Sequence, residues 1–188
     1  MNNLNEMTWG TPHPALKETV KGHFENDKYV FFWNGPFSNW YPAKFDMDTG
    51  TKWGVMTFTS SEQAMMFYKA IVFEDESSLI AIMSTNSPRE QKALGRKVKN
   101  FNQDKWESVC LDLITNVLVA KFGSDEELKK ILLDTGNKVI VEASQYDRVW
   151  GIGMGVEHKD ILDQTKWDGK NFLGICLMGA RTILSKDA

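Results

Sequence analysis

The chain has 188 residues, of which 42% are hydrophobic and 25% charged, and its formal net charge is −3. This length and composition are typical of one globular domain with a sizeable core. The charge argues against a surface that holds long duplex nucleic acid, because such a surface neutralises many phosphates, but it is compatible with a nucleotide-sized ligand.

The first part of the chain is predicted to contribute little regular structure. Residues 1–27 are polar and contain Pro12 and Pro14, so we expect an arm or an irregular cover. Strands are then predicted over residues 29–33, 43–47 and 52–58, because aromatic and branched residues there are bounded by turn-forming ones. These strands are enough for one small antiparallel sheet.

Helices dominate the rest of the chain. Ser87-Pro88-Arg89-Glu90 is a strong helix start, with a Ser cap, Pro in the first position and Glu three residues after the cap. An apolar stripe at spacings of three and four, opened by Asp104 and ended by Gly123, predicts the longest helix. The predicted helices cover residues 59–70, 77–83, 88 to 95 or 98, 104–123, 124–133 and 171–184. Residues 138–141 fit a short strand, and residues 149–157 form a glycine-rich loop.

Several classes of site and location are not expected. Cys110 and Cys176 lie in apolar helical patterns, which predicts buried thiols in a reducing compartment. The three histidines are scattered and no metal-ligand spacing is present, so we expect no metal and no other cofactor. No apolar run approaches the ~20 residues that span a membrane. The first residues lack the pattern of a signal peptide, and a cytoplasmic location is expected.

The segment from Thr59 to Ala70 carries the most informative pair of residues. It is predicted to be a helix whose only charged side chains, Glu62 and Lys69, are seven residues apart. They project from one side, about 10.5 Å apart along the axis. This separation is too long for a simple ion pair, yet both long side chains could converge on one small ligand. The other residues are mostly apolar, so the helix is buried and its charges need partners or a water-filled pocket.

A structural interpretation of the same residues stays open. Thr59 and Glu62 fit a capping box, in which both side chains bind free N–H groups at the helix start. Lys69 could extend its ammonium group to water along its apolar stem. The capping and site interpretations are compatible, because the helix dipole stabilises an ionised carboxylate in the first turn.

Seven short segments, taken in order, resemble the NADAR superfamily, which includes YbiA-like N-glycosidases. Each motif alone is weak, but the ordered set is specific and covers roughly residues 30–181. The segments are Phe37-Ser38-Asn39-Trp40 with Pro42, Ser61-Glu62-Gln63 with Lys69, Leu94-Gly95-Arg96, Lys105-Trp106-Glu107, Ala120-Lys121-Phe122, Asp147-x-x-Trp150-Gly151-Ile152-Gly153 and Asn171-x-Leu173-Gly174. The resemblance implies a single YbiA-like domain over residues 28–188, after an N-terminal arm over residues 1–27. Its fold class is α+β, mainly helical, with a small antiparallel sheet.

The resemblance also implies cleavage of an N-glycosidic bond on a ribose that carries a phosphate or ADP group. Similar members remove ADP-ribose from guanine bases in nucleic acid, or split ribosylated intermediates of riboflavin synthesis. Members that act on riboflavin intermediates have an acidic residue after the Trp-Gly pair, where this chain has Ile152. We therefore expect an ADP-ribosyl substrate, such as ADP-ribosylated DNA or RNA, with no membrane and no obligate protein partner.

Two other functions stay open at this point. The first is cleavage of a phosphoribosylated riboflavin intermediate or an NAD-related metabolite. The second is a non-catalytic sensor that binds ADP-ribose or NAD in the same pocket without turnover.

The resemblance assigns catalytic roles to Glu62, Lys69 and Asp147. Bond cleavage builds positive charge at the sugar C1 carbon, which the Glu62 carboxylate would stabilise, or it would activate the attacking water. Lys69 would orient the sugar or form a Schiff base with its ring-opened aldehyde. Asp147 would stand on the opposite wall of the site with Trp150.

The remaining assignments concern substrate binding, and each has a structural alternative. Trp106 would stack on a base, or it would only anchor the core. Arg96 would bind a phosphate, or it would lie exposed. Gly151 and Gly153 would let backbone N–H groups approach the ligand, or they would only form a tight loop. The substrate-binding set is Asn39, Trp40, Arg96, Trp106, Trp150, Gly151, Gly153 and Asn171.

Overall fold

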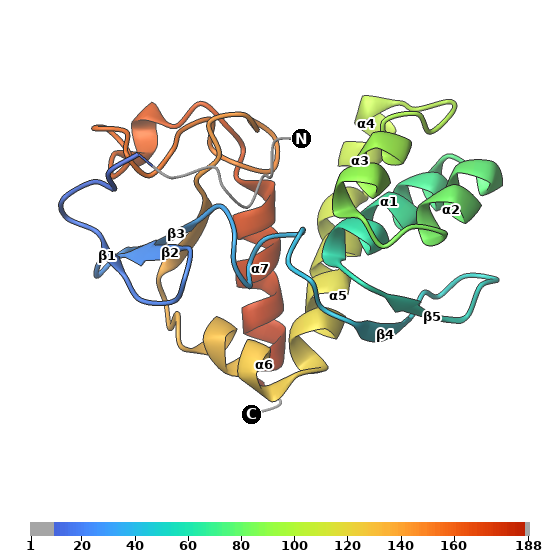
Figure 1. The fold of residues 1–188 in the computed structure, drawn as a ribbon, viewed down its shortest axis with the longest axis horizontal. Coiled ribbons are helices and arrows are strands. Elements are labelled where there is room, and N and C mark those ends of the chain that lie inside the picture. Colours follow the sequence, from blue (N-terminus) through green and yellow to red (C-terminus); the bar gives the residue numbers. More distant parts are fainter. Residues whose placement is uncertain (1–9, 187–188) are drawn as a thin grey trace. The chain divides into compact units, whose positions relative to one another are not determined.

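The structure is a computed structural model that describes residues 10–186 (Figure 1). Its contacts divide the chain into two compact units. The first unit contains residues up to Gly35 together with Thr135–Ile175, and the second contains Pro36–Asp134 together with residues from Cys176 onward. None of the helices in the described part of the chain has the length and apolar character that crossing a bilayer requires.

The first unit is built on a four-stranded mixed sheet. Its strands lie in the order β1 (Lys17–Glu18), β2 (His23–Glu25), β3 (Tyr29–Phe32) and β6 (Val139–Glu142). The pairs β1–β2 and β2–β3 are antiparallel, whereas β3 and β6 are parallel, with Val30 opposite Ile140. The strands predicted over residues 29–33 and 138–141 are confirmed. The irregular cover expected before residue 27 is wrong for residues 17–18 and 23–25, because these short strands gain their hydrogen bonds from pairing outward from β3.

The core of the first unit lies on this sheet. Trp167 packs against two strand residues, with ring centroids 5.6 Å from Tyr29 and 6.3 Å from Phe31. Residues 149–157 are irregular, as predicted, but two of them enter the core. The core cluster consists of Leu16, Phe24, Tyr29, Phe31, Val141, Ala143, Ile152, Val156 and Ile161. A 3₁₀ turn, η2 (Gln164–Lys166), precedes Trp167.

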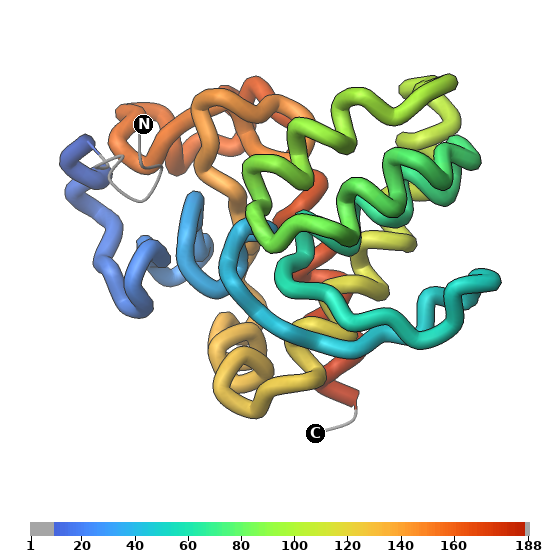
Figure 2. Tube along the Cα trace, turned by 45° about the vertical axis from the view of Figure 1, so that its right-hand side comes forward, coloured from blue at the N-terminus to red at the C-terminus, as the bar shows by residue number. Residues whose placement is uncertain are grey.

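The second unit contains one hairpin and most of the helices (Figure 2). In chain order its elements are β4 (Phe45–Asp48), β5 (Val55–Phe58), α1 (Ser61–Val72), α2 (Glu76–Met83), α3 (Pro88–Gly95), α4 (Gln103–Glu107), α5 (Cys110–Gly123) and α6 (Glu126–Leu133). The last helix, α7 (Phe172–Leu184), belongs to this unit from Cys176 onward. Cys110 and Cys176 are both buried free thiols, as predicted.

The α+β, mainly helical fold class is confirmed, but the strands form two sheets and not one. β4 and β5 pair only with each other, with Phe45 opposite Phe58. The Phe58 ring lies 5.4 Å from the ring of Phe67 in α1, so a helix covers the apolar side of the hairpin. This long-range packing removes any need for the hairpin to join β3.

The longest predicted helix is interrupted. Residues 104–123 were expected to form one helix, whereas α4 ends at Glu107 and α5 begins at Cys110. α4 is capped by Asn102, whose side chain accepts a hydrogen bond from the Lys105 N–H at 2.8 Å. The Ser108 hydroxyl donates to the Lys105 carbonyl at 2.8 Å and so competes with the helical hydrogen bonds at the break. The apolar spacing continues across the break, which explains why the pattern concealed it.

The helix that carries Glu62 and Lys69 starts one residue later than the capping interpretation requires. Ser60 is its N-cap, and the Ser60 hydroxyl accepts from the Gln63 N–H at 3.1 Å. The Gln63 side chain in turn accepts from the Thr59 N–H at 2.9 Å. The predicted Thr59–Glu62 capping box is therefore wrong. Ser60 and Gln63 serve the helix start, and the Glu62 carboxylate accepts a hydrogen bond from the Trp40 indole.

Helices α1 and α3 approach each other closely at Gly95. A methyl group at Gly95 would come within 1.9 Å of the Met66 sulfur, so a side chain there would force the helices apart or displace Met66. This contact brings the end of α3 against the middle of α1. The residue after Gly95 is Arg96, one of the predicted binding residues.

We predict that Ser60→Ala lowers the free energy of unfolding by about 1–2 kcal/mol, because it removes the cap of α1. Glu62→Gln should cost clearly less, since its side chain takes no part in the cap. Urea denaturation of both variants measures the difference. A loss for Glu62→Gln as large as that for Ser60→Ala would restore the capping role.

Candidate functional site

Glu62 binds the preceding loop at two points. The residue is only 4% exposed. Its carboxylate oxygen Oε2 accepts a hydrogen bond from the Trp40 indole Nε1 at 3.2 Å, and its backbone N–H donates to the Asn39 carbonyl at 2.9 Å. These bonds fix the loop of residues 36–41 against the first turn of α1. The buried carboxylate therefore has a defined orientation.

Lys69 lies within electrostatic range of both Arg96 and Glu62. Burial lowers the pKa of Lys69, the Arg96 guanidinium lowers it further, and the Glu62 carboxylate partly offsets both effects. The Lys69 ammonium also lies 4.1 Å from the ring centroid of Phe101. The half-buried Lys69 and the buried Glu62, two turns apart on α1, thus share one environment with the end of α3.

A third cation belongs to the same region. Lys92 of α3 has its ammonium 5.8 Å from the ring centroid of Trp40, the indole that donates to Glu62. We call Trp40, Glu62, Lys69, Lys92 and Arg96 the Glu62 cluster. Sequence reasoning missed Lys92, although its spacing of four residues from Arg96 places both on one face of a helix. The cations Lys92, beside Trp40, and Arg96, beside Lys69, suit a ligand that carries phosphate.

Asn39 contributes a buried group that is not satisfied by the protein. The residue is 7% exposed, and its side-chain oxygen Oδ1 has no hydrogen-bond partner among residues 10–186. Buried polar atoms in folded proteins are usually paired. The backbone carbonyl of the same residue is the one that holds Glu62. Asn39 therefore remains a candidate for binding a donor group of the ligand.

Trp106 is placed as a core anchor. It lies in α4 and is only 6% exposed, so little of its indole face is open to a base. The neighbouring Lys105 donates from its ammonium group to the Val72 carbonyl at 2.8 Å, which ties α4 to the end of α1. These contacts favour the structural alternative for Trp106.

The remaining predicted residues belong to the first unit, and Asp147 shapes a turn there. Its carboxylate oxygen Oδ1 accepts from the Val149 N–H at 2.9 Å and from the Trp150 N–H at 2.8 Å. Trp150 is half-buried and meets Phe172 edge to face, with ring centroids 6.0 Å apart. A catalytic role for Asp147 stays a prediction.

The two glycines of this loop are required by close backbone contacts. A methyl group at Gly151 would lie 2.8 Å from the Asp147 carbonyl oxygen and 2.9 Å from that of Glu142. Gly153 has a φ of +70°, and its N–H donates to the Asp147 carbonyl at 3.2 Å. The Gly153 N–H is thus used within the loop. This geometry favours the tight-loop alternative for both residues.

Asn171 binds strand β6 within the first unit. Its side-chain oxygen accepts from the Glu142 N–H at 3.0 Å, and its amide nitrogen donates to the Ile140 carbonyl at 2.9 Å. Its φ of 53° is in the left-handed region that Asn tolerates better than most residues. Both ends of the amide therefore serve the fold.

Sequence reasoning also missed the importance of Lys121, which it noted only as part of a motif. This residue of α5 is 0% exposed, and its ammonium nitrogen donates to the carbonyls of Pro36 at 2.8 Å and Ser38 at 3.1 Å. Burial lowers the pKa of Lys121 to about 7. The sequence did offer one signal of this burial, because Lys121 lies in the apolar stripe of a predicted helix.

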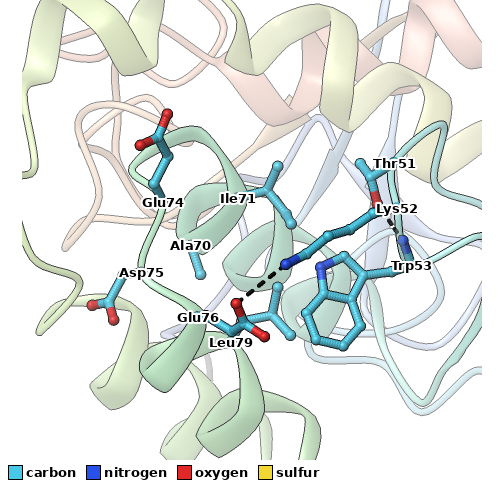
Figure 3. A pocket seen from close by; sticks show the side chains of 9 residues that line it. All are labelled: Thr51, Lys52, Trp53, Ala70, Ile71, Glu74, Asp75, Glu76 and Leu79. Carbon is cyan, nitrogen blue, oxygen red and sulfur yellow. Dashed lines mark hydrogen bonds and ion pairs between the residues drawn. The ribbon is translucent and has the colours of Figure 1, made fainter.

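A cavity of about 270 Å³ in the second unit lies elsewhere (Figure 3). It is lined partly by Ala70 and Ile71 of α1, and an ion pair of 3.2 Å joins Lys52 to Glu76 beside it. No member of the Glu62 cluster lines this cavity.

We predict that the stability of the protein relative to a Lys121→Met variant rises with pH. The pKa of Lys121 is about 7 when folded and 10.5 when unfolded, so the unfolded chain binds more protons between these values. The free energy of unfolding of the wild type minus that of the variant should therefore be larger at about pH 9 than at about pH 6, as measured by urea unfolding. Parallel pH profiles would contradict the burial of a titrating amine.

The chain is similar to known proteins over most of its length. The NADAR domain family matches residues 30–185. The chain is 39% identical over 166 residues to N-glycosidase R617 of Acanthamoeba polyphaga mimivirus, covering 84% of this chain and 96% of the relative. It is 32% identical over 168 residues to Protein irg-1 of Caenorhabditis elegans, covering 83% and 79%.

The bacterial relative YbiA has both a similar sequence and a similar fold. N-glycosidase YbiA of Escherichia coli strain K12 is 30% identical over 170 residues, covering 87% of this chain and 92% of the relative. The NMR structure of the E. coli protein YbiA superimposes with a TM-score of 0.67 at 29% identity, covering 88% of this chain and 90% of that one. The match over most of the chain, together with these relatives, shows that this protein belongs to the NADAR family.

Proposed function

We propose that this protein removes ADP-ribose from guanine bases of nucleic acid by hydrolysing the ribosyl N-glycosidic bond. The coarser statement, that the chain is a hydrolase of N-glycosyl bonds, follows from its family and from relatives named N-glycosidase that it matches over 92–96% of their length. The ADP-ribosyl guanine substrate is the proposal. The observation that carries it is the buried Glu62 carboxylate, which Trp40 orients and which has Lys69 in its electrostatic range, with Arg96 beside Lys69 and Lys92 beside Trp40.

Glu62 supplies the charge that the reaction needs. As the bond between C1 and the base nitrogen breaks, its electron pair leaves with the base and positive charge builds on the sugar. A fixed carboxylate stabilises that charge, or takes a proton from the water whose oxygen bonds to C1. The Trp40 hydrogen bond holds the carboxylate in one orientation, so little rearrangement is required during the reaction.

The environment of Lys69 supports a role at the sugar. Its pKa is lowered mainly by burial, which raises the fraction of neutral amine near neutral pH. A neutral amine can attack the aldehyde of a ring-opened ribose, forming an imine and releasing water. A Lys69 ammonium that only orients the sugar hydroxyls is the simpler alternative.

The cations on α3 support a phosphorylated substrate. The Arg96 guanidinium is exposed, and its planar fork suits phosphate oxygens. Lys92 adds a second charge one helical turn away, beside Trp40. A diphosphate such as that of ADP-ribose would therefore meet complementary charge near the proposed catalytic carboxylate.

Ile152 disfavours the riboflavin-intermediate alternative. It occupies the position where YbiA-type members that act on these intermediates are expected to have an acidic residue. Here the side chain is 0% exposed within the apolar core of the first unit. The chain therefore offers no carboxylate at this position to protonate a leaving group.

The substrate can be identified by incubating the protein with an ADP-ribosylated guanine oligonucleotide, with NAD and with phosphoribosylated riboflavin intermediates. Mass spectrometry should detect free ADP-ribose and restored guanine from the oligonucleotide. Turnover of the riboflavin intermediates alone would overturn the proposed substrate. Binding of ADP-ribose with no turnover of any compound would favour a sensor.

We predict that Glu62→Gln lowers kcat on the identified substrate by about 10²-fold or more, because it removes the charge and keeps the volume. Its circular dichroism spectrum and its affinity for ADP-ribose should match those of the wild type. Glu90→Gln is a matched control, since Glu90 is an exposed carboxylate in the first turn of α3. Full activity in Glu62→Gln would remove Glu62 from the mechanism.

If Lys69 forms a Schiff base, borohydride should trap a covalent sugar adduct during turnover. We expect peptide mapping to place the adduct on Lys69, and Lys69→Ala to abolish it. Lys92→Ala, which removes a neighbouring amine of the same cluster, should retain the adduct. An adduct that persists in Lys69→Ala at another residue refutes the assignment, and no adduct in the wild type leaves Lys69 with the orienting role.

A further inference from the structure

Lys121 is the most deeply buried charged group of the second unit among the described residues. It is 0% exposed on α5 and has no carboxylate partner in the described chain. Its surroundings are the rings of Tyr41 at 5.5 Å and Phe122 at 5.1 Å, together with two backbone carbonyls. Burying an amine is costly unless its hydrogen bonds are retained. An apolar side chain would fill the same space without that cost, so packing alone does not explain a lysine here.

The two carbonyls that Lys121 binds belong to the loop that orients Glu62. They are those of Pro36 and Ser38, immediately before Asn39 and Trp40. The Ser38 carbonyl also accepts from the Tyr41 N–H at 3.2 Å, and the Ser38 hydroxyl accepts from the Trp40 N–H at 3.1 Å. Lys121 therefore binds, through two backbone carbonyls, a turn that is already closed by its own hydrogen bonds.

The other side of this turn faces the first turn of α1. Asn39 provides the carbonyl that accepts from the Glu62 N–H, and Trp40 provides the indole that donates to the Glu62 carboxylate. A short path of hydrogen bonds thus runs from Lys121 through the backbone of the turn to Glu62. All of these residues lie within the second unit.

We propose that Lys121 is a positioning residue, which holds the loop of residues 36–41 so that Trp40 and Asn39 orient the Glu62 carboxylate for cleavage of the glycosidic bond. This inference rests on the proposed function of Glu62. Lys121 touches no reacting atom in this account and acts only through the loop.

A double-mutant cycle with Lys121→Met and Trp40→Phe tests the inference. Lys121→Met fills a similar volume but removes both hydrogen bonds to the loop, and Trp40→Phe removes the indole donor to Glu62. Each single variant should lower kcat by about tenfold to 10²-fold, through misplacement of the carboxylate. The double variant should be no slower than the slower single variant, because both changes break one path. Independent, multiplicative losses, or wild-type kcat in Lys121→Met, would overturn the inference.

Leu118→Ala is the matched control for a purely structural effect. Leu118 is 0% exposed in the same helix, and its truncation should lower stability by leaving a cavity. At a temperature where thermal unfolding shows every variant folded, Leu118→Ala should keep the wild-type kcat. A loss of kcat equal to that of Lys121→Met at matched stability would show that Lys121 contributes to folding only.

A readout without substrate separates this inference from the proposed function. The indole N–H resonance of Trp40 can be assigned by its absence from the ¹H–¹⁵N spectrum of Trp40→Phe. It should move in Glu62→Gln and also in Lys121→Met, while staying in place in Leu118→Ala. An unmoved resonance in Lys121→Met overturns the positioning role. A moved resonance in a protein that cleaves no ADP-ribosyl guanine upholds the positioning of Glu62 and rejects the proposed substrate.

Discussion

Two hydrogen bonds between Glu62 and the preceding loop are the constraint on which the candidate site depends. The backbone N–H of Glu62 binds the Asn39 carbonyl, and its carboxylate receives the Trp40 indole. A buried glutamate at a helix start could otherwise adopt several rotamers. With both bonds in place, the loop and the first turn of α1 hold the carboxylate in one orientation, and Lys69 lies two turns further along the same helix.

Close packing of two helices brings Arg96 into electrostatic range of Lys69 and Lys92 beside Trp40. Gly95 allows α3 to approach α1 at Met66, and Arg96 follows at the end of that helix. The resulting environment lowers the pKa of Lys69 through burial and through Arg96, while Glu62 opposes the change. The reaction needs charges of both signs. A carboxylate stabilises the positive charge that develops on the sugar, and cations bind the phosphate that the sugar carries.

Local signals in the sequence predicted much of the fold. The Ser87 cap marked the start of α3 correctly, because a cap depends on residues only a few positions away. The separation into two sheets, the parallel pairing of β6 with β3 and the strands within residues 17–25 depend on contacts far apart in the chain. The break between α4 and α5 was not predicted, because the apolar spacing is the same on both sides of it.

The candidate site divides in the same way. Glu62 and Lys69 could be identified from helical spacing, and Arg96 from an ordered set of motifs. Asn171 was given a ligand-binding role because an exposed amide and one bound to the backbone have the same sequence. Lys92 and Lys121 were overlooked for the opposite reason, since their roles appear only when a second element lies beside them.

The most direct test of this account is a crystal structure of the Glu62→Gln variant with an ADP-ribosylated guanine nucleotide bound. The account predicts the C1 carbon of the ribose within about 3.5 Å of the residue 62 side chain, a distance at which reacting groups meet, with the diphosphate against Lys92 and Arg96. A nucleotide bound away from this cluster, for example in the cavity beside Trp53, would contradict it.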